Sequence, residues 1–328
     1  MDKQLTPLSA SRLKTFESCS WIYWCKYILK LPDKPNAGSL SGSCCHMILE
    51  NLARPKNKKR FDAIIKNGGF PFCDKAIERY VRSYIKKHGL PDTQVNEIEK
   101  MLSVAFNKDF LCQNANKETF TVELPFDITD PTKSYRILGF IDKYAEYPEK
   151  GLCRIVDYKS SKRKFSGEDL DENVQAKMYS LVGKYRNPAL APVVEFLFLK
   201  FPEDPVQRLR FSVAELDAFE VYLSECSAKL NNFGYKDAVK NFAAKQQYPK
   251  EGFGGPLMCG KCKQPNMLKT DGSPQWYCQY KFAFDYYVLC GENDEVVKTS
   301  FTPLEENPAK NQYVVKKSYK GCPAFAKK

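Results

Sequence analysis

The sequence lacks any apolar run that approaches the length needed to span a membrane, about 20 consecutive apolar residues. Its first residues, Met-Asp-Lys-Gln-Leu-Thr-Pro, contain no apolar signal region. It also lacks a disordered tract, since 43% hydrophobic and 27% charged residues are the composition of an ordinary globular protein. These absences argue against a membrane protein and a disordered chain, and we expect a cytoplasmic protein.

The chain does carry an excess of positive charge. Its 328 residues include 51 Lys and Arg against 39 Asp and Glu, a formal net charge of +12. Such a balance favours a polyanionic partner such as nucleic acid, although solvated lysine faces produce the same balance. The length is sufficient for one large domain or two, with a buried core.

Two apolar, β-prone runs, residues 135–147 and 152–158, each contain one aspartate where a half-buried position is expected. A bare carboxylate is costly to desolvate there unless a cation lies against it. Because side chains alternate along a strand, Asp157 and Lys159 point to the same face. Asp142, Asp157 and Lys159 on one side of a hairpin therefore predict a Mg²⁺ or Mn²⁺ site, since these ions prefer oxygen ligands.

Predicted helices carry further polar side chains. A helix over residues 42–53 places His46 and Glu50 four residues apart on one face. A helix over residues 168–185, with Ser166 as its candidate N-cap, places Gln175 and Tyr179 one turn apart. Glu123, on a strand expected from residue 118, could also reach the metal, but we expect it to be an exposed strand glutamate.

These motifs, in this order, resemble the PD-(D/E)XK nuclease superfamily, and within it the RecB-like exonuclease branch that includes iron–sulfur nucleases of CRISPR adaptation. The resemblance covers residues 8–185 well and the cysteine-bearing tail loosely. It implies an α/β fold with a restriction-endonuclease-like core, a mixed central sheet flanked by helices. We expect an N-terminal helical region over residues 1–117, the nuclease core over 118–247, and a cysteine-rich, metal-stapled segment with a basic tail over 248–328.

The resemblance also implies a metal-dependent DNA exonuclease that hydrolyses phosphodiester bonds in single-stranded DNA or at DNA ends, during recombination, repair or replication. A helicase or a recombination protein would then be its partner. The alternative is a catalytically silent module of the same fold that binds nucleic acid or scaffolds a complex. Such a module is expected to have lost a carboxylate or the lysine, and all of them are present.

The family assigns a role to each matching residue. The Mg²⁺ or Mn²⁺ ion would be held by His46, Asp142, Asp157 and the main-chain carbonyl of Tyr158. Lys159 would orient the attacking water and offset charge on the phosphoryl oxygens. Gln175 would steady the site and Tyr179 would border the nucleic-acid strand, as the family's Gln-x-x-x-Tyr helix does.

Thirteen cysteines in an intracellular chain do not predict a disulfide framework. Four of them occur singly in apolar or amphipathic runs and are expected to pack as small hydrophobic residues: Cys73, Cys112, Cys153 and Cys226.

The C-terminal cysteines need a separate explanation. Cys259-Gly-Lys-Cys262 is typical of a metal knuckle, but a second Cys-x-x-Cys, which a complete zinc ribbon requires, is missing. The resemblance implies a [4Fe–4S] cluster held by Cys19, Cys259, Cys262 and Cys278. Because the gap from Cys262 to Cys278 is longer than in the family, zinc held by Cys259, Cys262, Cys278 and Cys290 stays open.

The rest of the chain completes the predicted order of elements. Helices are expected over residues 8–31, 75–88, 93–112 and 213–233, and strands over 193–200 and 207–211. Residues 54–60 are expected to form a basic surface loop, and residues from 291 onward a basic appendage.

Overall fold

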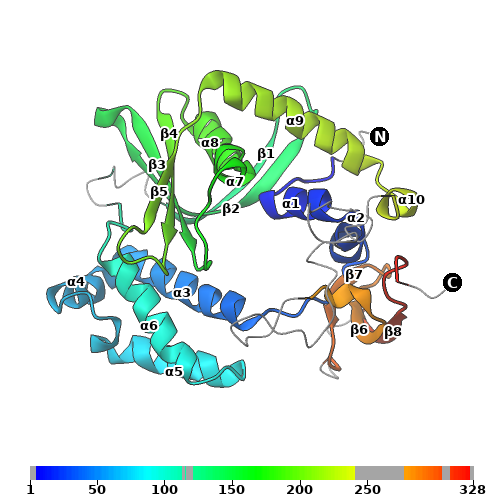
Figure 1. The fold of residues 1–328 in the computed structure, drawn as a ribbon, viewed down its shortest axis with the longest axis horizontal. Coiled ribbons are helices and arrows are strands. Elements are labelled where there is room, and N and C mark those ends of the chain that lie inside the picture. Colours follow the sequence, from blue (N-terminus) through cyan, green and yellow to red (C-terminus); the bar gives the residue numbers. More distant parts are fainter. Residues whose placement is uncertain (1–4, 113–114, 116–120, 241–276, 305–310, 326–328) are drawn as a thin grey trace, which may run out of the picture. The chain divides into compact units, whose positions relative to one another are not determined.

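The computed structural model describes residues 5–112, 115, 121–240, 277–304 and 311–325 (Figure 1). The chain forms two compact units, each built from two separate segments. The first unit consists of Met1–Ala10 and Pro35–Ala228, and the second of Ser11–Lys34 and Lys229–Lys328. Among the described residues, no helix combines the length and the apolar character that crossing a membrane requires.

The first unit is built on a five-stranded sheet in the order β1-β2-β3-β4-β5. Only the β3–β4 pair is parallel, so the sheet is mixed, as predicted. Its strands are β1 (Thr121–Thr129), β2 (Arg136–Tyr147), β3 (Leu152–Lys159), β4 (Ala191–Phe198) and β5 (Val206–Leu209). Its helices are α3 (Ala37–Ala53), α4 (Lys58–Lys66), α5 (Lys75–Lys87), α6 (Thr93–Phe106), α7 (Glu168–Asp171), α8 (Val174–Arg186) and α9 (Val213–Asn231), whose last residues reach into the second unit.

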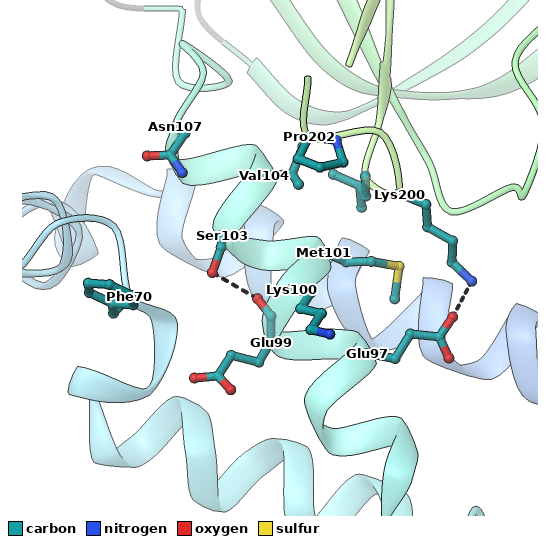
Figure 2. Close-up of a pocket in the computed structure, with 11 residues that line it drawn as sticks. Phe70, Glu97, Glu99, Lys100, Met101, Ser103, Val104, Asn107, Lys200 and Pro202 are labelled. Atoms are coloured by element: carbon teal, nitrogen blue, oxygen red, sulfur yellow. Dashed lines mark hydrogen bonds and ion pairs between the residues drawn. The ribbon is translucent and has the colours of Figure 1, made fainter. Parts of the chain in front are cut away.

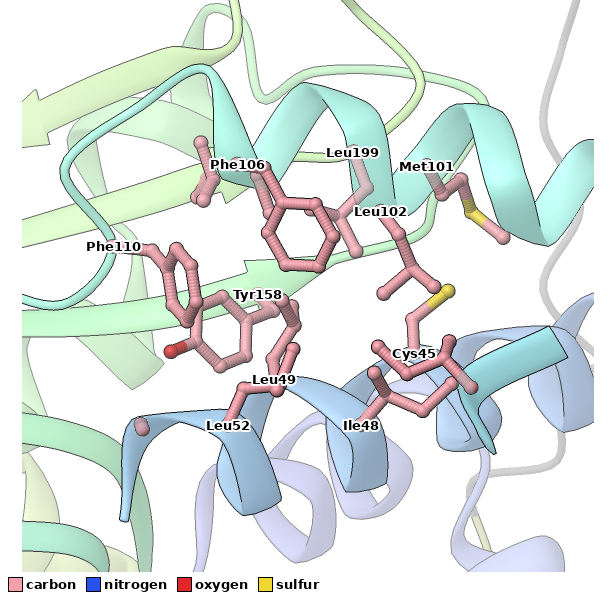
Figure 3. Packing of buried hydrophobic residues seen from close by; sticks show 14 of the residues in the cluster. Cys45, Ile48, Leu49, Leu52, Met101, Leu102, Phe106, Phe110, Tyr158 and Leu199 are labelled. Carbon is pink, nitrogen blue, oxygen red and sulfur yellow. The ribbon is translucent and has the colours of Figure 1, made fainter. Parts of the chain in front are cut away.

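Helices cover both faces of this sheet. On one face, Tyr158 of β3 is buried with Leu49 of α3 and Phe106 of α6 in a continuous apolar cluster (Figure 3). On the other face, α8 approaches β3 so closely that a Cβ on Gly183 would lie 3.1 Å from the Sγ of Cys153. This packing holds the end of β3 between α3 and α8, the two helices that carry His46 and Gln175.

The second unit combines the two ends of the chain. Its helices are α1 (Ala10–Ser18, which begins in the first unit), α2 (Ser20–Tyr23), a π-helical turn (Trp24–Ile28) and α10 (Tyr235–Ala238). Its antiparallel three-stranded sheet has the order β7-β6-β8, formed by β6 (Phe284–Cys290), β7 (Val296–Ser300) and β8 (Tyr313–Tyr319). Trp21 Nε1 donates a hydrogen bond to the hydroxyl of Tyr319 at 2.7 Å, within a buried cluster shared by both segments.

Several predicted elements differ from the structure. The helix expected over residues 8–31 is interrupted at Cys19, whose backbone is extended (φ −169°). The prediction of a basic loop over residues 54–60 is wrong for its second half, because α4 begins at Lys58 and buries Phe61 and Ile64. Residues after 291 are more than an appendage, because they supply β7 and β8.

Two smaller predictions also fail. Asn173, rather than Ser166, caps α8, accepting a hydrogen bond from the backbone N–H of Ala176 at 3.0 Å. Cys73, expected to be packed, is exposed, whereas Cys112, Cys153 and Cys226 are buried as predicted.

Candidate active site

Three carboxylates form a row across the sheet at the point where two strands separate. The β2–β3 register ends at the pair Lys143–Val156. The next residues along the two strands are Asp142 on β2 and Asp157 on β3. On the other side of β2, the β1 residue opposite Asp142 is Glu123, because the flanking pairs of this register are Val122–Lys143 and Leu124–Ile141.

Glu123 has an unusual backbone for a strand residue. Its φ is +49°, the left-handed region that non-glycine residues rarely adopt. Such a conformation costs on the order of 1 kcal/mol and persists where the surrounding structure enforces it, commonly at functional sites. Here one ligand atom each from His46, Glu123 and Asp142 lie within 4.8 Å of one another, a spacing that one metal ion can bridge.

His46 reaches this row from α3. Its Nδ1 lies 3.3 Å from Asp142 Oδ2, and its Nε2 lies 2.9 Å from the main-chain oxygen of Tyr158. Asp142 Oδ2 also accepts a hydrogen bond of 2.7 Å from the backbone N–H of Tyr158. Burial disfavours the charged imidazole, but the hydrogen bond to Asp142 and the charges of Asp142 and Asp157 outweigh it and raise the pKa of His46 to about 9.

Asp157 is held by residues of β3 and α8. Its Oδ2 lies 2.6 Å from Lys159 Nζ, and its Oδ1 accepts a hydrogen bond of 2.8 Å from Gln175 Nε2. The same Gln175 accepts a hydrogen bond of 2.7 Å from Lys159 through Oε1 and donates one of 2.8 Å to the hydroxyl of Tyr179. That hydroxyl lies 3.1 Å from Asp157 Oδ1, so four predicted residues form one network.

The electrostatics of the row favour a bound cation. Burial raises the pKa of Asp157, and the charge of Asp142 adds to the shift although Lys159 opposes it. Burial likewise raises the pKa of Glu123, with further contributions from the charges of Asp142 and Glu50. Carboxylates, an imidazole and a main-chain oxygen are ligands suited to Mg²⁺ or Mn²⁺, so the residues present fit a divalent ion.

The structure thus brings the predicted residues together in two contact groups. His46, Asp142 and the backbone of Tyr158 form one, and Asp157, Lys159, Gln175 and Tyr179 form the other. Tyr179 is only 5% exposed and contacts Asp157 rather than presenting a surface to a nucleic-acid strand. Glu123, considered from the sequence as a ligand but expected to be an exposed strand glutamate, is instead half-buried and joins His46 and Asp142.

The predicted cluster cysteines are described only in part. Cys259 and Cys262 lie outside the described residues, whereas Cys19 and Cys278 are buried in the same apolar cluster of the second unit. Cys25 lies in that cluster too, and burial raises the pKa of its thiol. The neighbouring thiols of Cys278, Cys322 and Cys19 raise this pKa further. Cys290 is buried at the end of β6.

A pocket of about 590 Å³ lies elsewhere in the first unit, between α6 and the segment after β4 (Figure 2). Figure 2 shows Lys200 extended towards Glu97, with which it forms an ion pair. Met101 and Pro202 supply apolar surface. None of the predicted site residues lines this pocket, so we do not assign the reaction to it.

Comparison with known families gives one result. The family model described as PD-(D/E)XK nuclease superfamily matches residues 7–266, which include every residue of the row and of both contact groups. No curated protein sequence matches the chain.

Proposed function

The chain belongs to the PD-(D/E)XK nuclease superfamily, and from this membership and the site geometry we propose that it is a metal-dependent DNA exonuclease. Its substrate would be single-stranded DNA or DNA ends, in recombination, repair or replication. The observation that carries the proposal is the row of Glu123, Asp142 and Asp157, with His46 at one side and Lys159 at the other.

The ion would be held by His46, Asp142, Asp157 and the main-chain oxygen of Tyr158, and we add Glu123 to this set because its carboxylate lies within the same 4.8 Å group. A bound Mg²⁺ or Mn²⁺ supplies a Lewis acid that polarises a phosphoryl oxygen and acidifies water. The register between β2 and β3 ends before Asp142 and Asp157, and beyond it the backbone N–H of Tyr158 donates a hydrogen bond to the carboxylate of Asp142.

Lys159 would act on the reacting groups. Its ammonium is fixed between Asp157 Oδ2 at 2.6 Å and Gln175 Oε1 at 2.7 Å, so it is preorganised. A fixed ammonium orients the attacking water and offsets negative charge that grows on the phosphoryl oxygens. Gln175 and Tyr179 are positioning residues, because they hold Asp157 and Lys159 in place through hydrogen bonds.

The decisive experiment is a digestion assay on labelled single- and double-stranded DNA with Mn²⁺ or Mg²⁺, with and without EDTA. We expect cleavage that EDTA abolishes. Asp157→Ala and Lys159→Ala should each lower the rate at least 100-fold, because they remove a metal ligand and the ammonium, while DNA binding stays nearly unchanged.

A matched control is Lys164→Ala, which removes a lysine just beyond the site that pairs with Asp204. It should retain most of the cleavage rate. Wild-type rates in the Asp157 or Lys159 variant would refute the catalytic assignment. DNA binding without any cleavage by the wild-type protein would instead favour a silent nucleic-acid-binding module.

We also propose that the cysteines of the second unit hold a [4Fe–4S] cluster through Cys19, Cys259, Cys262 and Cys278, with zinc on Cys259, Cys262, Cys278 and Cys290 as the alternative. The support is the common burial of Cys19 and Cys278 near Cys25. A cluster of this type requires four thiolates.

A further inference from the structure

Phe140 exposes its ring in the middle of a strand that otherwise buries its large side chains. The residue is 61% exposed, whereas Ile137, Ile141 and Tyr144 of the same strand are all 0% exposed. A phenylalanine gains little from a strand position in water, since its stability contribution comes from burial. Single exposed apolar side chains are common on protein surfaces, so the significance of this ring depends on where it lies relative to the carboxylate row.

The position of Phe140 relates it to the carboxylate row. It precedes Asp142 by two residues on β2, and strand alternation places the two side chains on the same face. The β2–β3 register has already ended at Lys143, so Phe140 pairs only with β1, where its partner is the exposed Pro125. The ring consequently lies beside the site, at the part of β2 that β3 does not pair with.

The backbone beneath this ring is fixed. The Tyr179 hydroxyl donates a hydrogen bond of 3.0 Å to the main-chain oxygen of Phe140, and the same hydroxyl lies 3.1 Å from Asp157 Oδ1. At the preceding position, a Cβ on Gly139 would lie 2.7 Å from the Cζ of Phe126, so β1 and β2 are tightly packed there. The backbone that carries the exposed ring is thus fixed relative to Asp157.

We propose that the ring of Phe140 stacks on the nucleobase next to the phosphodiester bond under attack, which makes the site selective for an unpaired strand. The inference rests on the proposed nuclease function and specifies its substrate. Every base has a face on which an aromatic ring can stack, whereas bases of an intact duplex are already stacked on their neighbours. The exposed Lys162 and Arg163, which follow β3, supply charge for the phosphates of the same strand.

The test compares Phe140→Leu, Phe140→Tyr and Phe140→Trp with the matched control Phe70→Leu, which removes another exposed ring (65% exposed) of the same unit. On a single-stranded oligothymidine, Phe140→Leu should raise KM about 10- to 100-fold. Phe140→Tyr, which keeps an aromatic ring, should have a KM close to that of the wild-type protein. Phe70→Leu should leave KM unchanged. An abasic nucleotide at the stacked position should abolish the difference between wild type and Phe140→Leu.

Binding is measured separately from cleavage, in the Asp157→Ala background with fluorescein-labelled oligothymidine. Phe140→Trp should give indole fluorescence that the oligonucleotide quenches beyond the change seen in the parent protein. Equal affinities of Phe140→Leu and Phe70→Leu, or no quenching, would overturn the stacking role while the nuclease assignment stands. Absence of cleavage by the wild-type protein would overturn the nuclease assignment, and these binding measurements would still decide the stacking. If Phe140→Leu does not fold, the KM of Phe140→Tyr and the fluorescence quenching of Phe140→Trp decide whether the ring stacks on the base.

Discussion

At the scale of single residues, His46 occupies the position of a cation. Its two ring nitrogens contact the carboxylate of Asp142 and the main-chain oxygen of Tyr158, which are also proposed ligands of the metal. A protonated imidazole therefore satisfies, in part, the same oxygens that an ion would satisfy. Because a ligating histidine must be neutral, metal and proton compete at this site.

This competition predicts a pH dependence of metal binding. The pKa of His46 is raised to about 9, so the proton is bound at pH 7, and its stabilising contacts are lost as the pH rises through about 9. The apparent Kd for Mn²⁺ should fall by up to about tenfold per pH unit between roughly pH 7 and pH 9. Calorimetry in two buffers of different ionisation enthalpy measures the protons released.

The control for this prediction uses the two histidines of the chain. His46→Gln should release about one proton fewer and flatten the dependence. His88→Gln changes the C-cap residue that follows α5 and should leave proton release unchanged. A Kd that does not vary with pH in the wild-type protein would contradict the competition.

Residue types in the sequence predicted much of the site but not all of it. Asp142, Asp157 and Lys159 are recognisable because charged residues in apolar strands are costly and therefore informative. Glu123 is not recognisable as a ligand in the same way, because an alternating strand normally exposes its polar residues. Its left-handed backbone also cannot be predicted from the sequence. The assignment of metal ligands, Glu123 included, stays a prediction until metal binding is measured.

At the scale of elements, the approach of α3 to β3 depends on one glycine. A Cβ on Gly42 would lie 2.3 Å from Ser160 Oγ and 3.2 Å from Ser160 Cβ, immediately after Lys159. The hydroxyl of Ser160 can rotate away from such a Cβ but its Cβ cannot, so an added methyl group would require α3 and the end of β3 to shift apart by a few tenths of an ångström.

We predict that Gly42→Ala lowers kcat/KM by about threefold to tenfold, because even a shift of a few tenths of an ångström moves His46 relative to Asp142 at the reacting site. The same substitution would otherwise stabilise a helix by about 1 kcal/mol. Steady-state cleavage rates and urea unfolding together separate the two effects.

The second-site variant Gly42→Ala/Ser160→Gly removes the clashing side chain and should recover most of the activity. Gly38→Ala, in the first turn of the same helix, would place its Cβ 3.3 Å from Asn36 Oδ1 and serves as the control. If Gly42→Ala retains full activity, α3 is not positioned by this contact.

The elements themselves were predictable where their pattern is local. The strands that carry Asp142 and Asp157 lie within one residue of the predicted runs, because apolar, β-branched stretches bounded by turn residues are distinctive. The α4 helix was missed because its basic first turn, Lys58 to Arg60, conceals the buried Phe61 and Ile64. The cap at Asn173 was missed because a short separate helix, α7, precedes it.

At the scale of the whole molecule, the chain divides in a way that sequence order does not suggest. We predicted three consecutive segments with boundaries after residues 117 and 247, and these boundaries stay predictions. The structure forms the second unit from residues 11–34 together with the C-terminal third of the chain. Trp21 and Tyr319, which are in contact, lie 298 residues apart in the sequence, so no local sequence pattern predicts such a contact.

This pairing of distant segments provides a test of the cysteine proposal. Cys19 and Cys278 come from the two segments of the second unit and are buried in one cluster, so a shared cofactor would fasten the segments together.

Protein purified anaerobically should contain about four iron atoms per chain and absorb near 400 nm, roughly as expected for a [4Fe–4S] cluster. Cys19→Ser and Cys278→Ser should each lose the iron and lower the midpoint of urea unfolding, since a structural metal contributes folding free energy. Cys153→Ser replaces a buried cysteine of the first unit and should retain the iron. Zinc in place of iron, lost in Cys290→Ser but kept in Cys19→Ser, would instead select the ligand set confined to the C-terminal segment.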